Sequence, residues 1–93
     1  MRVDFSKSFK DFKGKALGIS MADEIGKILF NVGLSGNAPL TSEQKYMAYK
    51  LCNRMQAGGE VELTSEEAVF LLKICGETLT AGAYGQVRDL IEG

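Results

Sequence analysis

The stretch LTSEQKYMAYKLC (residues 40–52) is followed by LTSEEAVFLLKIC (residues 63–75), and the two share six of thirteen positions. In each copy a threonine is followed three residues later by a glutamine or a glutamate. This is the spacing of a capping box, in which the two side chains satisfy free backbone amides at a helix start. We therefore expect helices that begin after Thr41 and after Thr64. The similarity is compatible with a duplicated helix-turn unit and also with common capping chemistry, and both interpretations stay open.

The helix that follows Thr41 has one apolar face, and its lysines and arginine fall on other sides. Tyr46 and Tyr49 lie off the apolar stripe. Because tyrosine is enriched at protein interfaces, these two residues are candidate contacts for a protein partner. The apolar stripe comprises Met47, Ala48, Leu51, Cys52 and Met55.

The helix that follows Thr64 is apolar on almost every side. A helix of this kind is usually enclosed by others, so we expect it to be the central helix of the fold. Its apolar side chains include Val69, Phe70, Leu71, Leu72, Ile74 and Cys75.

The rest of the chain after residue 19 adds two more helices and their connections. Ser20 can cap a helix that Gly33 is placed to end, and the only proline lies in an expected loop at residues 34–40. Valine and leucine alternate with two glutamates in a way that favours a short extended segment near residues 60–63. Thr80 begins the last helical pattern.

Residues 1–19 contain two competing patterns. Val3 and Phe5 alternate as in a strand, whereas Phe5, Phe9 and Phe12 recur at helical spacing. The segment is therefore compatible with a strand or hairpin and with a helix. The phenylalanine spacing predicts that all three rings complete the core, with the lysines between them forming a solvated face.

Charge is distributed unevenly along the chain. Residues 1–19 carry five positive and two negative side chains, a local charge of +3, although the net charge of the whole chain is −1. Lysines can bind phosphates while aromatic rings stack on unpaired bases, so this segment is a candidate nucleic-acid arm. The balance of the whole chain argues against a surface devoted entirely to nucleic acid. The candidate nucleic-acid contacts are Lys7, Lys10, Lys13 and Lys15.

The 93 residues are expected to form one domain, in which residues 1–19 are a basic, aromatic segment and residues 20–93 a helical core. Histidine is absent from the sequence, which removes the usual general base and the usual nitrogen ligand for zinc. Cys52 and Cys75 are too far apart for a Cys-x-x-Cys motif and are expected to be buried thiols. We therefore predict no catalytic residue, no cofactor and no metal.

The sequence contains no stretch apolar enough to form a secretion signal or a membrane span. We expect a protein of the reducing cytoplasm that does not enter a membrane.

Residues across the second half of the chain resemble small uncharacterised proteins encoded in tailed-phage and prophage genomes. The resemblance implies a compact protein that acts by binding in the cytoplasm of a bacterial host. It rests on Lys45, Tyr49 and Leu51, on Val61-Glu62-Leu63-Thr64 with Glu66-Glu67 and Leu72-Lys73, and on Tyr84-Gly85-Gln86-Val87 with Leu90-Ile91-Glu92.

Together these patterns predict a mainly α fold, a small bundle of three to four short helices around a central apolar helix. A short N-terminal strand or hairpin and the extended segment near residues 60–63 complete it. The predicted function is a non-enzymatic protein-protein interaction or structural accessory module that binds a protein partner or itself. The alternative is a nucleic-acid-associated regulatory protein that uses the basic N-terminal segment.

Overall fold

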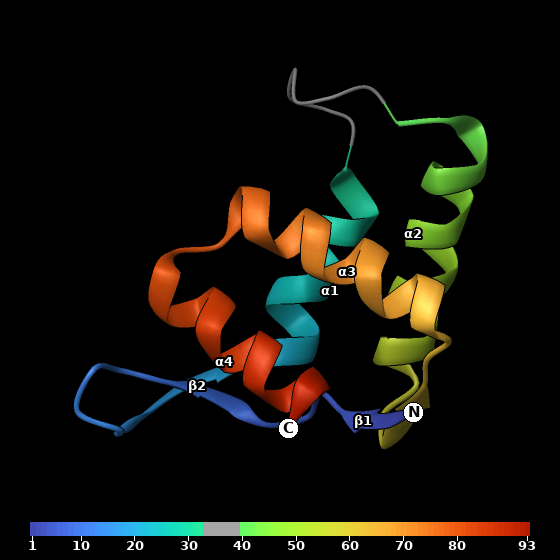
Figure 1. Cartoon of the computed structure of the whole chain (residues 1–93). Helices are drawn as coiled ribbons and strands as arrows, with labels where there is room; N and C mark the ends of the chain where they lie inside the picture. The colour runs from blue at the N-terminus through green and yellow to red at the C-terminus, as the bar shows by residue number, and fades with distance from the viewer. Residues whose placement is uncertain (33–39) are drawn as a thin grey trace.

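The computed structural model describes residues 1–32 and 40–93, which form four helices and two small antiparallel sheets (Figure 1). The expected mainly α composition is confirmed. In chain order the elements are β1 (Arg2–Asp4), β2 (Ser8–Lys10), β3 (Ala16–Ser20), α1 (Met21–Asn31), α2 (Ser42–Gln56), β4 (Glu60–Glu62), α3 (Ser65–Thr78) and α4 (Ala81–Glu92).

The N-terminal segment forms strands, as the alternation of Val3 and Phe5 indicates, and does not form a helix. β1 pairs antiparallel with β4, and Val3 lies opposite Val61 in the register of this pair. Both valines are buried, so the two short strands close the core with one apolar side chain each. The helical interpretation of residues 1–19 is wrong because β1 pairs with a strand about 60 residues further along the chain.

β2 and β3 form a second antiparallel pair, a hairpin that extends away from the helices in Figure 1. The side chain of Asp11 organises its turn, because one carboxylate oxygen accepts hydrogen bonds from the backbone amides of Lys13 and Lys15, both at 2.9 Å. Gly14 has φ +85°, a conformation that a residue with a Cβ rarely adopts. The turn therefore has a defined shape although it projects into solvent.

The helices begin where the capping residues predict. The hydroxyl of Ser20 accepts a hydrogen bond from the amide of Asp23 at the start of α1. Both capping boxes form, with Thr41 at the start of α2 and Thr64 at the start of α3, and Thr80 caps α4. The repeated sequence thus encodes two helix starts.

The first helix ends at Asn31. Gly33, which was expected to end it, and the loop expected at residues 34–40 lie outside the described residues, except for Leu40.

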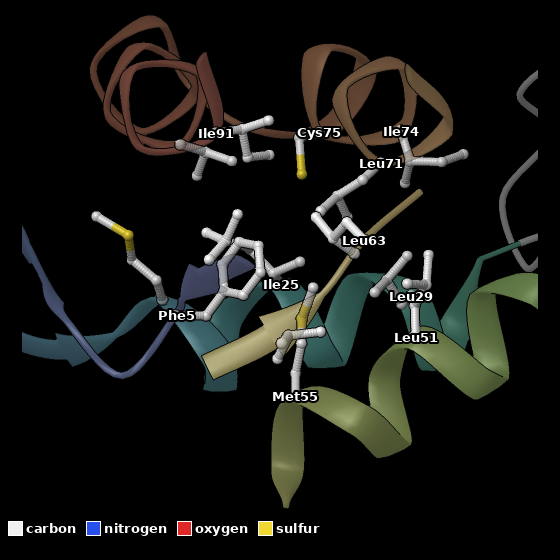
Figure 2. Close-up of a cluster of buried hydrophobic side chains, with 14 of the residues drawn as sticks. Phe5, Ile25, Leu29, Leu51, Met55, Leu63, Leu71, Ile74, Cys75 and Ile91 are labelled. Carbon is white, nitrogen blue, oxygen red and sulfur yellow. The ribbon is translucent and has the colours of Figure 1, made fainter. Parts of the chain in front are cut away.

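The core lies between two pairs of helices. Figure 2 shows side chains of α3 and α4 on one side, among them Leu71 and Ile91, facing Leu29 and Leu51 of α1 and α2. Leu63, which directly follows β4, lies between the two groups. Every helix thus contributes buried side chains to one apolar cluster.

The expectation that α3 is enclosed on all sides is not confirmed. Val69 is 69% exposed, and Lys73 on the same helix is also exposed. The buried side of α3 is nevertheless wide, because five of its side chains belong to the core. They are Ala68, Phe70, Leu71, Ile74 and Cys75.

An arginine connects the end of α2 to the start of α3. Between these helices the chain turns at Gly58 and Gly59, which both have positive φ, and continues into β4. Arg54 donates a hydrogen bond to the carbonyl oxygen of Glu62 at 2.9 Å and forms an ion pair with Glu67. The Glu67 carboxylate also completes the capping box of α3, so one cluster of polar groups fixes three consecutive elements.

Candidate binding surfaces

Tyr46 and Tyr49 lie on the solvent side of α2 and form a cluster with Phe30 of α1. The ring centroids of Tyr46 and Tyr49 are 6.4 Å apart with nearly parallel planes, and those of Phe30 and Tyr49 are also 6.4 Å apart. The three side chains are 64%, 59% and 49% exposed for Phe30, Tyr46 and Tyr49, respectively. We call these three residues the aromatic surface.

The helical phase of α2 determines that the two tyrosines face solvent. Its cap at Thr41 fixes where the helix begins, and the burial of Ala48 and Leu51 then turns Tyr46 and Tyr49 toward solvent. The Nζ atom of Lys50 lies 5.0 Å from the ring centroid of Tyr46, within the range of a cation–π interaction. That this surface contacts a protein partner remains a prediction.

Phe30 was not among the residues that the sequence analysis selected. It follows Leu29, which is buried, and lies outside the apolar stripe of α1, the face of that helix that is buried in the core. A large apolar residue off the stripe of an amphipathic helix is the signal that identifies it.

The four lysines of the N-terminal segment lie on and beside the hairpin. Lys7, Lys10, Lys13 and Lys15 are all exposed, and none of them forms a salt bridge with any residue in the described part of the chain. Their contact with nucleic acid remains a prediction.

The expected burial of three phenylalanines is correct for two of them. Phe5 and Phe9 are buried, whereas Phe12 is 94% exposed. The prediction for Phe12 is wrong because it assumed a helix, and the hairpin instead carries this residue into its turn, beyond the reach of the core.

A cleft of about 410 Å³ separates the apolar side of the hairpin from the start of α4. Leu17 and Ile19 line it from β3, and Leu79 and Ala83 line it from the other side. The position of the hairpin is fixed by Gln86 of α4, whose side-chain amide accepts from the backbone amide of Lys10 at 2.8 Å and donates to its carbonyl at 2.9 Å. Phe12 also lines this cleft.

Two glutamates, Glu62 and Glu67, form ion pairs with arginines of neighbouring elements. Glu62 pairs with Arg2 at 3.2 Å, across the sheet of β1 and β4. The guanidinium of Arg54 donates to Glu67 and holds the pKa of that carboxyl below its ordinary value of 4.5. The lowered pKa moves the Glu67 carboxyl away from neutral pH, where a general base works best.

The two cysteines are buried free thiols, as expected. Burial raises the pKa of Cys75 to about 12 and also raises the pKa of Cys52. Both thiols are therefore protonated at neutral pH, and only the thiolate is an effective nucleophile or metal ligand. Within residues 1–32 and 40–93 no three acidic or cysteine side chains gather in a group that could hold a metal ion.

Comparison with protein-family models, with curated proteins and with solved structures gives no match for this chain. None of the described helices has the length and apolar character needed to cross a membrane.

Proposed function

We propose that the protein is a non-enzymatic binding module that docks a protein partner, or a second copy of itself, through the aromatic surface. The observation that carries this proposal is the cluster of Phe30, Tyr46 and Tyr49, whose rings pack on one another while about half or more of each side chain stays exposed. Aromatic residues are enriched at interfaces and supply a large share of binding energy there.

The geometry of the cluster supports docking. Because the Tyr49 ring lies next to the rings of both Phe30 and Tyr46, little side-chain freedom is lost when a partner covers the three residues. Lys50 beside Tyr46 adds a positive charge at the edge of the apolar contact, where a polar rim is typical of interfaces.

A non-enzymatic role is consistent with how the chain uses its ionisable groups. Glu62 and Glu67 join neighbouring elements through Arg2 and Arg54, and the thiols lie in the core. In this proposal the module is encoded by a phage or prophage and acts in the bacterial cytoplasm, as the sequence resemblance implies.

The proposal is tested with the variant Tyr46→Ala/Tyr49→Ala, compared with the wild type and with Val69→Ala, which removes an exposed apolar side chain from α3. Light scattering over a range of concentrations measures self-association, and immobilised protein measures the capture of a host protein from lysate. We expect association in one of these assays for the wild type and for Val69→Ala, and its loss in the double variant.

Two results would contradict the proposal. One is a wild-type protein that stays monomeric and retains no partner. The other is a double variant that associates as strongly as the wild type.

A further inference from the structure

The hairpin of β2 and β3 presents an aromatic ring to solvent on an ordered support. Phe12 is 94% exposed at the turn, although a phenylalanine in a small protein is usually buried. The Asp11 carboxylate fixes the turn by accepting from two backbone amides, and Gln86 fixes its base by pairing with the backbone of Lys10. The ring is therefore held on a stiff arm that projects beyond the helices.

Four lysines lie on and beside the hairpin that carries this ring. The Nζ atom of Lys13 lies 5.7 Å from the ring centroid of Phe12. Lys10 and Lys15 flank the turn on β2 and just before β3, and Lys7 precedes β2. Among the described residues these lysines have no salt-bridge partner, so their charge is available to an anionic ligand.

The cleft beside the ring adds an apolar wall. Leu17 and Ile19 on the hairpin face Leu79 across a space of about 410 Å³ that Phe12 also lines. Two acidic side chains, Asp11 and Glu24, lie on this lining. One carboxylate oxygen of Asp11 accepts from the backbone amides of Lys13 and Lys15, and the Glu24 carboxylate is 3.7 Å from the ammonium of Lys27, which offsets its charge. A flat apolar group stacked on Phe12 would thus have apolar side chains on the protein side.

From these features we infer that the hairpin is a second binding site, separate from the aromatic surface, which takes single-stranded nucleic acid. An unpaired base stacks on Phe12 at the mouth of the cleft, and the lysines contact the phosphates on either side of it. The alternation of flat rings and negative charges in a single strand matches the alternation of ring and lysines on the hairpin. In a duplex the base faces are covered by their neighbours, so a lone ring on a hairpin tip is suited to unpaired bases.

The test uses the full chain and a fluorescently labelled oligothymidylate of about 12 nucleotides, within the range of known single-strand site sizes. Fluorescence anisotropy measures the dissociation constant at salt concentrations between about 50 and 200 mM. We expect saturable binding that weakens as salt rises, with Phe12→Ala binding about tenfold more weakly, since one stacked base contributes about 1–3 kcal/mol. Phe12→Trp keeps a stacking ring and should retain the affinity.

The charge contribution is tested by Lys13→Gln/Lys15→Gln. Each phosphate contact contributes about −0.7 to the slope of log K against log salt for a single strand, so this variant should flatten the slope by about 1.4. The matched control, Lys45→Gln/Lys73→Gln, removes the same charge from α2 and α3 and should leave the slope unchanged. All the substituted side chains are exposed, so circular dichroism should show the same fold for each variant.

Four outcomes would overturn the inference. They are no binding at the lowest salt, equal binding by Phe12→Ala, an equal effect of the Lys45→Gln/Lys73→Gln control, and a duplex of the same length that binds as tightly as the single strand. Binding to vesicles of anionic lipid, together with no binding to the oligonucleotide, would assign the hairpin to a membrane surface and would overturn it as well.

Discussion

Glu67 accepts hydrogen bonds from two directions. Its carboxylate accepts a hydrogen bond from the backbone amide of Thr64 at 2.9 Å, which completes the cap of α3. It also accepts a hydrogen bond from the guanidinium of Arg54. Hydrogen bonding to Arg54 is the main cause of its lowered pKa, and the carboxyl is largely shielded from solvent. A group whose pKa is lowered by folding stabilises the native state when it is ionised.

The stability of the protein should therefore fall in acid partly through Glu67. The contribution is complete above the ordinary pKa of 4.5 and is lost as the pH falls through that value toward the lower pKa of the folded state. Urea denaturation between about pH 7 and pH 3 measures this loss.

Glu67→Gln keeps the capping acceptor and removes the charge. We expect it to cost about 1 kcal/mol at neutral pH, because Arg54 is partly exposed and solvent screens the pair. The variant should also lose less stability in acid than the wild type. Glu66→Gln, on the same first turn but without a salt-bridge partner among the described residues, is the control. An equal effect of both substitutions would show that the Arg54 contact contributes nothing.

Single residues of the candidate surfaces differ in how well the sequence predicts their exposure. Tyr46 and Tyr49 are correctly placed on the solvent side because the phase of α2 follows from local capping and periodicity. Phe12 is not, because its spacing from Phe9 suits a helix and only the hairpin pairing, a tertiary fact, moves it outward. Phe30 could have been identified from its place off the stripe of α1.

At the scale of elements, the two copies of the opening motif form the same cap in different surroundings. The Thr41 box at the start of α2 is made only with Gln44 and is exposed. The Thr64 box at the start of α3 shares Glu67 with Arg54 and adjoins β4. The second box thus also fixes the connection from α2, because it contains Glu67 where the first box contains Gln44.

The two threonines provide a direct comparison of these surroundings. Replacement of an N-cap threonine by alanine typically costs about 0.5–2 kcal/mol. We expect Thr41→Ala to lie at the lower end of that range and Thr64→Ala at the upper end, because the second substitution also loosens the carboxylate that Arg54 holds. Chemical denaturation of both variants measures the difference, and a larger cost at Thr41 would contradict this account.

Helix starts could be predicted from the sequence because capping is local chemistry, and all the expected caps form. The extended segment near residues 60–63 was also expected, and β4 occupies Glu60–Glu62. Its pairing with β1 could not be predicted, because nothing in three-residue strands specifies a partner about 60 residues away. The exposure of Val69 was missed for a related reason, since composition alone does not say how much of a helix the rest of the molecule covers.

At the scale of the whole molecule, the sheet of β1 and β4 joins the two ends of a long stretch of chain. Val3 and Val61 face each other in its centre, and the backbones of Met1 and Leu63 exchange hydrogen bonds of 2.8 and 3.0 Å beside it. Both valines belong to the apolar cluster that the four helices share. The strands therefore stabilise the entire core and not only each other.

Two valine-to-alanine substitutions test whether the strands stabilise the core. Val61→Ala removes buried methyl groups from the core and should lower the free energy of unfolding by about 1–3 kcal/mol. Val69→Ala makes the same chemical change at an exposed position and should alter it by no more than about 0.5 kcal/mol. Thermal and urea unfolding of the two variants provide the comparison, and similar losses for both would show that the sheet lies outside the cooperative core.

The pairing of β1 with β4 has a consequence for folding during synthesis on the ribosome. β1 is synthesised about 60 residues before β4, so Val3 cannot be buried against Val61 until β4 has also been translated. Nascent chains that halt before Glu60 will present Val3 to chaperones and proteases. The sheet that completes the core therefore forms only after β4 has been made, in a step that joins two segments about 60 residues apart.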